Sequence, residues 1–158
     1  MKHWSWQNNQ LKKEYNIFMR SLGLDIGDKR IGVAISDPEE ILASPLTTIY
    51  RDTDENAIKA ILELAKEKNV GKIVFGLPYS LNGSVGSQAN KVLAFMKAFS
   101  DHTDLEILIQ DERLSTLGSQ RLLAEAGTRG KEFKQKRDAA AAAFVLQGYL
   151  DSLKTIEA

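Results

Sequence analysis

Hydrophobic and polar residues alternate in two neighbouring segments in the first quarter of the chain. Two leucines and an isoleucine alternate with a glycine and an aspartate over Leu22–Ile26, and a second alternation covers Ile31–Ile35. A period of two is typical of β-strands, and the polar sequence Gly27–Lys29 between the two segments predicts a hairpin turn. A third strand is expected over Leu46–Tyr50. The regular structure therefore begins with three strands connected in series.

Beyond these strands, helical and strand patterns alternate. Apolar residues between Ala57 and Ala65 fall on one face of a helix that Thr53 or Asp54 can cap. The later segments are a buried strand over 72–76, a helix containing 92–99, a strand over 105–109, and two helices over 115–126 and 138–153, which a basic loop separates. The order β-β-β-α-β-α-β-α-α predicts a mixed α/β sheet with helices on its faces.

The two ends of the chain differ from this central pattern. Residues 1–18 contain both tryptophans and several glutamines and asparagines but no sustained period, so we expect an N-terminal extension before a single domain over 19–158. Near the other end, the alanine run Ala139–Ala143 lies in the last expected helix. Alanine favours the helix, and its small side chain permits close approach to a sheet. The run is therefore expected to serve packing.

Composition narrows the class of protein. The 158 residues suit one domain, and the 21 basic and 21 acidic side chains cancel, so no global field draws the protein to nucleic acid. The lack of cysteine excludes disulfides, thiolate zinc sites and cysteine nucleophiles. The apolar run Ala139–Leu146 is too short to span a membrane, and residues 1–18 lack the apolar core of a secretion signal. We expect a cytoplasmic protein with no membrane partner.

Local basic clusters offer places where a polyanion could still bind. The segment 129–137 carries Arg129, Lys131, Lys134, Lys136 and Arg137 against the single acid Glu132. This segment is either a solvated surface loop or a phosphate-binding patch. Lys29 and Arg30 at the hairpin turn have the same two interpretations. Arg113, next to Glu112, either orients that acid or touches a substrate.

Three carboxylates stand at the ends of expected elements. Asp25 lies inside an otherwise apolar strand, Glu112 follows the last strand, and Asp138 opens the alanine-rich helix. Each has an ordinary local explanation: a turn contact for Asp25, a helix first-turn acid or an Arg113 ion pair for Glu112, and an N-cap for Asp138. If the three converge on one face, their repulsion requires hard cations such as Mg²⁺ or Mn²⁺. That arrangement favours phosphodiester hydrolysis with two ions.

Four motifs in order along the chain resemble the YqgF/RuvX family, described as pre-16S rRNA nucleases and formerly as Holliday junction resolvases. They are LGLDIGDKRIGVAISD (22–37), GLP (76–78), DERLST (111–116) and DAAA (138–141). The resemblance implies an RNase H-like fold, a five-stranded mixed sheet in the order 3-2-1-4-5 with helices on both faces. It also implies that Asp25, Glu112 and Asp138 are the catalytic acids that bind Mg²⁺ or Mn²⁺, with two ions in the site.

Three classes of function follow from these residues. The first is a metal-dependent nuclease, a hydrolase acting on ester bonds, whose partner is structured RNA: pre-16S rRNA or a pre-ribosomal particle. Its alternative substrate is branched DNA, for which a two-fold resolvase is expected to dimerise, whereas the rRNA nuclease could be a monomer or a homodimer. The second class is a phosphotransferase of the actin and hexokinase type, which needs two such domains where this chain supplies one. The third is a non-catalytic RNA-binding assembly module, to which clustered acids would bring no benefit.

Overall fold

The fold is a single sheet between two layers of helices. The computed structural model describes residues 19–78, 85–111 and 130–157. The strands are β1 (Arg20–Ile26), β2 (Arg30–Ser36), β3 (Ala43–Tyr50), β4 (Val70–Leu77) and β5 (Glu106–Asp111); the described helices are α2 (Asp54–Glu67), α3 (Ser87–Ser100) and α5 (Gly130–Glu157). The helix expected over 115–126 lies outside the described residues.

The strands form one five-stranded sheet in the order β3-β2-β1-β4-β5. The hairpin strands β1 and β2 are antiparallel, as are β2 and β3, whereas β1, β4 and β5 run parallel. This confirms the mixed sheet and the strand order that the family resemblance implies. The edge strand β3 accommodates Pro45, which has no backbone N–H to donate to a further strand.

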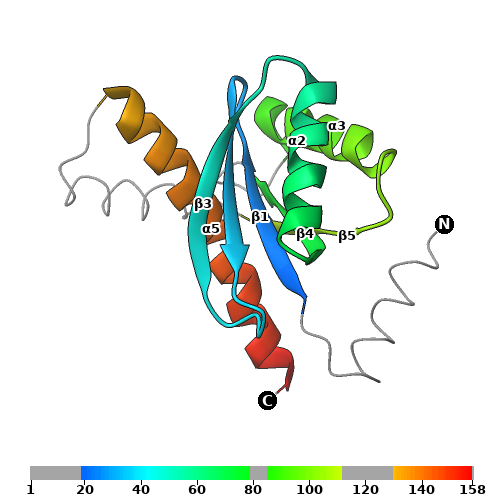
Figure 1. The fold of residues 1–158 in the computed structure, drawn as a ribbon, viewed down its shortest axis with the longest axis vertical. Coiled ribbons are helices and arrows are strands. Elements are labelled where there is room, and N and C mark those ends of the chain that lie inside the picture. Colours follow the sequence, from blue (N-terminus) through cyan, green and yellow to red (C-terminus); the bar gives the residue numbers. More distant parts are fainter. Residues whose placement is uncertain (1–18, 79–84, 112–129, 158) are drawn as a thin grey trace.

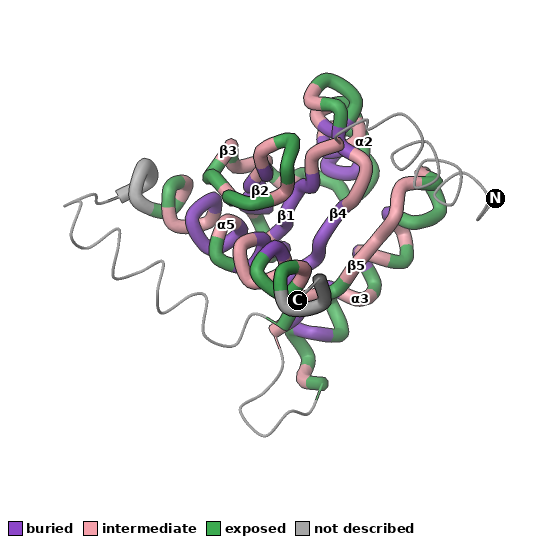
Figure 2. Tube along the Cα trace, turned by 90° about the horizontal axis from the view of Figure 1, so that it is seen from below, coloured by how far each residue is buried: buried purple, intermediate pink, exposed green. Residues whose placement is uncertain are grey.

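Helices cover both faces of the sheet, as the sequence predicts. In Figure 1, α2 and α3 lie on one side of the sheet and α5 on the other. The larger core packs Leu22, Leu24 and Phe75 of the sheet against apolar residues of α2 and α3. Thr53 caps α2 by accepting a hydrogen bond from the backbone N–H of Asn56. The smaller core packs α5 on the opposite face, and Figure 2 shows the buried residues concentrated along β1, β4 and the adjoining turns of α5.

Helix α5 begins earlier than the sequence patterns predict. The helix starts at Gly130, so four basic residues expected in a loop are helical, and Asp138 lies well inside the helix rather than at its N-cap. These four are Lys131, Lys134, Lys136 and Arg137. The expected loop and cap are therefore wrong. The physical reason is that lysine, glutamine, glutamate and arginine are good helix formers, and no proline interrupts the segment.

Two glycines allow α5 to approach the sheet closely. A Cβ atom added at Gly32 would overlap the carbonyl group of Asp138, and one added at Gly23 would lie 2.7 Å from the Cβ of Leu146. The four alanines Ala139–Ala142 are buried, with exposures between 0% at Ala142 and 8% at Ala140. The alanine run therefore serves packing, as expected, because helix and sheet backbones meet where neither carries a bulky side chain.

A buried polar cluster ties α5 to the sheet at the end remote from Asp25. The Lys72 Nζ donates hydrogen bonds to Glu40 Oε2 and Tyr149 Oη, both at 3.2 Å. The hydroxyl of Ser21 donates to the other oxygen of Glu40, while the backbone N–H of Ser21 donates to Ser36 Oγ at 2.8 Å. Glu40 itself adopts a left-handed backbone conformation, with φ of 58°. The turn after β2 is thus shaped to deliver a carboxylate to Lys72.

We expect the replacement Lys72→Met to destabilise the fold, because it leaves the Glu40 carboxylate, only 16% exposed, without its cation. The expected loss is about 1–3 kcal/mol at pH 7. Adding Glu40→Gln should restore part of the loss, because it removes the unpaired charge. Unfolding in urea measures both changes. A single variant as stable as the wild type would contradict this role of Lys72.

The same cluster predicts a loss of stability at alkaline pH. Burial alone would lower the pKa of Lys72, but the charge of Glu40 and the hydrogen bonds to Glu40 and Tyr149 raise it overall. Burial raises the pKa of Tyr149 as well. Both groups bind their protons more tightly in the folded protein, so their stabilisation is complete below about pH 10 and decreases above it. Between pH 9 and 11, the wild type should lose more unfolding free energy than Lys72→Met.

Candidate active site

The carboxyl ends of three parallel strands meet at one edge of the sheet. Leu24 of β1 pairs with Phe75 of β4, which pairs with Ile109 of β5. One residue further along β1 is Asp25, and β5 ends at Asp111. In α/β sheets, ligands bind outside the carboxyl ends of the strands. This edge is therefore the place in the fold where a site is expected.

Asp25 lies on the face of the sheet that α5 covers. Its neighbours Leu24 and Ile26 belong to the core beneath α2 and α3, and side chains alternate between faces along a strand. Gly23, two residues earlier, faces Leu146 of α5. Asp25 is half-buried, and its cross-strand partner on β2 is Gly32. Both residues consequently lie on the α5 side.

Asp138 lies directly over Gly32. Its carbonyl group occupies the space that a side chain at position 32 would need. Because Gly32 pairs with Asp25, the backbone of Asp138 lies over the strand next to Asp25, about 5 Å across the sheet. The chain thus brings two carboxylates, far apart in sequence, to the same face and the same edge.

Two arginines neutralise the Asp138 carboxylate. The Nε of Arg30 donates a hydrogen bond to Asp138 Oδ2 at 2.7 Å, and the Nη2 of Arg137 lies 3.9 Å from Oδ1. The side chain of Asp138 is 15% exposed and that of Arg30 is 23% exposed. A carboxylate with so little access to water needs a counter-charge, which Arg30 supplies. The N-cap contact that the sequence suggested is replaced by this ion pair.

The other predicted site residues have different outcomes. Glu112 follows Asp111 in the chain but lies outside the described residues. Three of the predicted basic residues are exposed: Lys29, Lys134 and Lys136. Two more, Arg30 and Arg137, are half-buried beside Asp138, and Lys131 lies within α5. The remaining two, Arg113 and Arg129, lie outside the described residues. The described basic residues therefore begin at the carboxylate edge and continue along the first turns of α5.

Sequence reasoning missed Arg51, which holds the hairpin turn. Its side-chain Nη1 donates to the carbonyl of Gly27 at 2.9 Å, and its backbone N–H donates to the carbonyl of Lys29 at 2.8 Å. The guanidinium also lies 5.0 Å from the centre of the Phe95 ring. Arg51 follows the third strand without any motif, so only the pairing of that strand with the hairpin could have revealed it. It fixes the turn that carries Lys29.

A groove runs beside Asp138, between the edge strand β3 and α5. It has a volume of about 550 Å³, and its lining includes Thr48, Lys136 and Ala139. Thr48 donates a hydrogen bond to the carbonyl of Gln135 at 2.7 Å, and Gln135 donates to the hydroxyl of the exposed Tyr50. The described lining carries a lysine and no acid, which suits a phosphate-bearing ligand.

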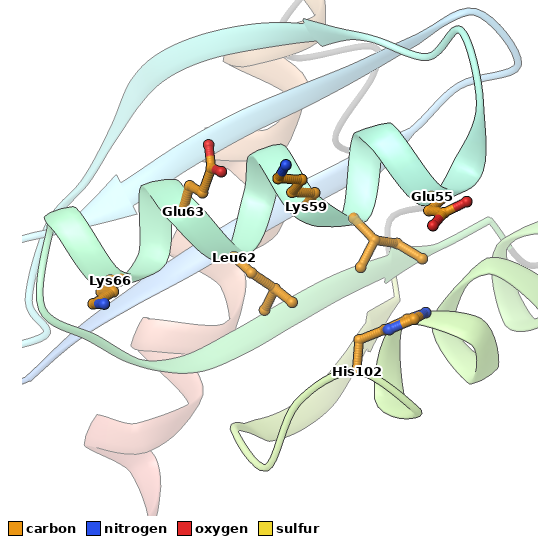
Figure 3. A pocket seen from close by; sticks show the side chains of 7 residues that line it. Glu55, Lys59, Leu62, Glu63, Lys66 and His102 are labelled. Atoms are coloured by element: carbon orange, nitrogen blue, oxygen red, sulfur yellow. The ribbon is translucent and has the colours of Figure 1, made fainter.

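A second groove lies on the opposite face and is remote from the carboxylates. Figure 3 shows Glu55, Lys59, Glu63 and Lys66 along α2, with His102 across the groove from them. The charges of the two acids and two lysines along α2 cancel. In the described lining of this groove, His102 has neither a second histidine with which to bind a metal ion nor a partner with which to act as a general base. This groove is therefore not the candidate site.

The donor set of the candidate site fits a hard divalent cation. Asp25 and Asp138 offer oxygen ligands on one face, and Mg²⁺ or Mn²⁺ prefers a few carboxylates together with water. Across the described residues, histidine, cysteine and acidic side chains do not gather in any group of three or more that could hold a metal ion. The third expected ligand, Glu112, lies in a part of the chain that the structure does not describe.

Within the described part, no helix is long and apolar enough to cross a membrane.

Comparison with known proteins matches this chain to a nuclease family. A family model described as "RuvX: Holliday junction resolvase" matches residues 19–152. Two relatives named "Putative pre-16S rRNA nuclease" come from Desulforamulus reducens and Clostridium acetobutylicum. They are 47% and 43% identical to this chain over 135 residues, which is 85% of this chain and 98% and 100% of the relatives.

Solved structures with a similar fold are distant in sequence. The structure titled "T. thermophilus RuvC in complex with Holliday junction substrate" has a TM-score of 0.56 at 12% identity and covers 87% of this chain and 96% of its own. A Fowlpox virus resolvase bound to Holliday junction DNA has a TM-score of 0.54 at 15% identity and covers 85% and 99%. At these identities the likeness establishes the RNase H-like fold alone.

Proposed function

This chain belongs to the RuvX family, and from that premise we propose that it is a divalent-metal-dependent nuclease that hydrolyses phosphodiester bonds during 5′-end maturation of pre-16S rRNA. Membership of a nuclease family supports a hydrolase that acts on nucleic acid. The choice of pre-16S rRNA is supported by the name of relatives that match this chain over nearly their whole length. We place the reaction in the cytoplasm, where a pre-ribosomal particle would be the substrate.

The observation that carries this proposal is that Asp138 lies over Gly32, the cross-strand partner of Asp25. A carboxylate on β1 and one on α5 reach the same edge of the sheet only because Gly32 lets the helix backbone touch β2. Ligands of α/β proteins bind outside the carboxyl ends of the strands, which is where these two acids lie. Their placement is useful if they hold cations against a phosphate.

The proposed roles follow from position. Asp25, Glu112 and Asp138 hold the ions, which when bound lower the pKa of a water and neutralise charge on the phosphate. Lys29 at the hairpin turn and Lys134 and Lys136 on α5 bind phosphates on either side of the cleaved bond. Arg51 keeps the turn in place through the carbonyl groups of Gly27 and Lys29.

The test is a cleavage assay on a precursor RNA that contains the 5′ end of 16S rRNA. We expect cleavage with Mg²⁺ or Mn²⁺, none with a chelator, and recovery when metal is added back in excess. Cleavage that continues in the chelator would contradict metal dependence. A four-way DNA junction forms the second arm of the assay. If the protein cut the junction but not the RNA, and formed dimers in solution, the substrate would be branched DNA instead.

A matched RNA-binding measurement separates the enzyme from a binding module. Wild-type protein that binds the precursor tightly, yet cleaves neither substrate with either metal, would support the non-catalytic assembly role. The proposed nuclease predicts both binding and cleavage of the same RNA.

A further inference from the structure

Arg30 forms an ion pair with Asp138, one of the three carboxylates proposed to bind metal. Its Nε lies 2.7 Å from Asp138 Oδ2, across 108 residues of sequence. The pair is well shielded, with side-chain exposures of 23% and 15%. Arg30 is the first residue of β2, directly after the hairpin turn, and it lies on the same face as Gly32. The contact is thus formed by the sheet register and by the seating of α5, not by a local turn.

The ion pair and a metal ion compete for the same oxygen. A cation that binds Asp138 Oδ2 must displace the Arg30 Nε, and a divalent ion near that oxygen repels the guanidinium. Arg137 is a weaker competitor, since its Nη2 is 3.9 Å from the other carboxylate oxygen. Hydrogen bonds between charged groups are the stronger kind, so the competition is substantial.

Arg30 is placed to act after its displacement. Its side chain uses only Nε in the contact with Asp138, and among the described residues its two terminal nitrogens make no hydrogen bond. A guanidinium is a planar fork that binds phosphate through two parallel hydrogen bonds. Lys29, the preceding residue, is exposed at the same turn. A released Arg30 would therefore lie at the proposed phosphate path.

We propose that Arg30 is a placeholder cation: it neutralises Asp138 before metal binds, is displaced by the incoming ion, and then contacts the substrate phosphate. This inference rests on the proposed function, because it takes Asp138 as a metal ligand. It deepens that function by making metal binding and nucleic-acid binding cooperative. Without metal the protein would bind RNA without Arg30.

The test compares metal affinity in Arg30→Met, Arg30→Lys and wild type, by calorimetry with Mn²⁺ and no nucleic acid. Arg30→Met should bind Mn²⁺ about tenfold more tightly, because no guanidinium competes for Asp138. Arg30→Lys, which keeps the charge but loses the Nε contact, should fall between the two. Lys29→Met is the matched control, since it removes a neighbouring charge that does not contact Asp138; its Mn²⁺ affinity should change less than threefold.

RNA binding gives the second measurement. Fluorescence anisotropy with the precursor RNA is measured in chelator and in Ca²⁺, chosen as a probe that fills the site with little cleavage. Arg30→Met should match wild type in chelator and bind about tenfold more weakly in Ca²⁺. Equal weakening in both conditions would make Arg30 an independent phosphate contact. Unchanged Mn²⁺ affinity would make the ion pair purely structural. Either result overturns the placeholder role.

Failure of the proposed function gives a different pattern. In that case Mn²⁺ binding would be absent, or insensitive to Asp138→Asn, in wild type and Arg30→Met alike. Thermal unfolding in chelator shows whether each variant is folded. Arg30→Met should melt lower than wild type there, because Asp138 loses its partner, and Mn²⁺ should raise its melting temperature more than that of the wild type.

Discussion

Replacing Gly32 with alanine should destabilise the protein strongly, by about 3 kcal/mol or more, because the added methyl group would displace helix α5. A Cβ at position 32 would overlap the carbonyl group of Asp138 and lie 3.0 Å from the amide nitrogen of Ala139. These are backbone atoms on the face of α5 that packs against the sheet, and they cannot rotate away as a side chain can. Relief requires a movement of α5 itself, and the smaller core moves with it.

A second glycine of the same helix–sheet interface provides the control. The three atoms nearest to a Cβ at Gly148, on α5, would all belong to the side chain of Gln110, with its Nε2 at 3.1 Å. That side chain is flexible, and alanine favours the helix by up to about 1 kcal/mol over glycine, so Gly148→Ala should be neutral or stabilising. Urea unfolding measures both variants. A Gly32→Ala protein with wild-type stability would mean that α5 is not seated on β2 as the structure has it.

The Gly32 replacement should also lower nucleolytic activity more than stability alone accounts for. Gly32 is the point at which Asp138 meets the strand that pairs with Asp25. A shift of α5 separates the two carboxylates even in molecules that remain folded. Activity measured well below the melting temperature of the variant should therefore fall at least tenfold, since catalytic geometry tolerates displacements of only about 1 Å.

The sheet could be predicted from the sequence because its signal is local. Alternation in β1 and β2 and the Thr53 cap of α2 each depend on neighbouring residues. The start of α5 could not be predicted in the same way. Five basic residues in nine suggest a solvated loop, but lysine and arginine have high helix propensity, and α5 includes the four of them that lie within its bounds. Charge density describes exposure, whereas the backbone conformation follows propensity and packing.

The arrangement of the candidate site residues could be predicted only in part, for a related reason. The residue types and their positions at element ends pointed to Asp25 and Asp138, and the structure places both on one face. The Arg30–Asp138 pair was not predicted, because it depends on sheet register and helix seating together. The sequence suggested an N-cap for Asp138 because a cap is the commonest local use of an aspartate before an alanine run. Long-range pairs have no such local signature.

The replacement Asp25→Asn should abolish cleavage of precursor RNA, with a loss of about 10³-fold or more in kcat. The change keeps the size and shape of the side chain and removes the negative charge. An amide is a poor substitute for a carboxylate toward Mg²⁺ or Mn²⁺, so the proposed metal site loses an anionic ligand. The variant should bind precursor RNA in chelator as the wild type does, because the phosphate contacts proposed for Lys29, Lys134 and Lys136 remain.

Asp28→Asn is the matched control for this experiment. Asp28 belongs to the same hairpin, is exposed, and pairs with Lys91 of α3 at 3.4 Å. Its replacement removes the same negative charge at a position three residues from Asp25. The surface ion pair that is lost contributes little to stability. Cleavage by Asp28→Asn should stay within threefold of wild type. If both variants cleaved equally well, Asp25 would be a structural acid; if both lost activity equally, the effect would come from the net charge of the hairpin. Only a loss confined to Asp25 supports a metal-binding carboxylate at the end of β1.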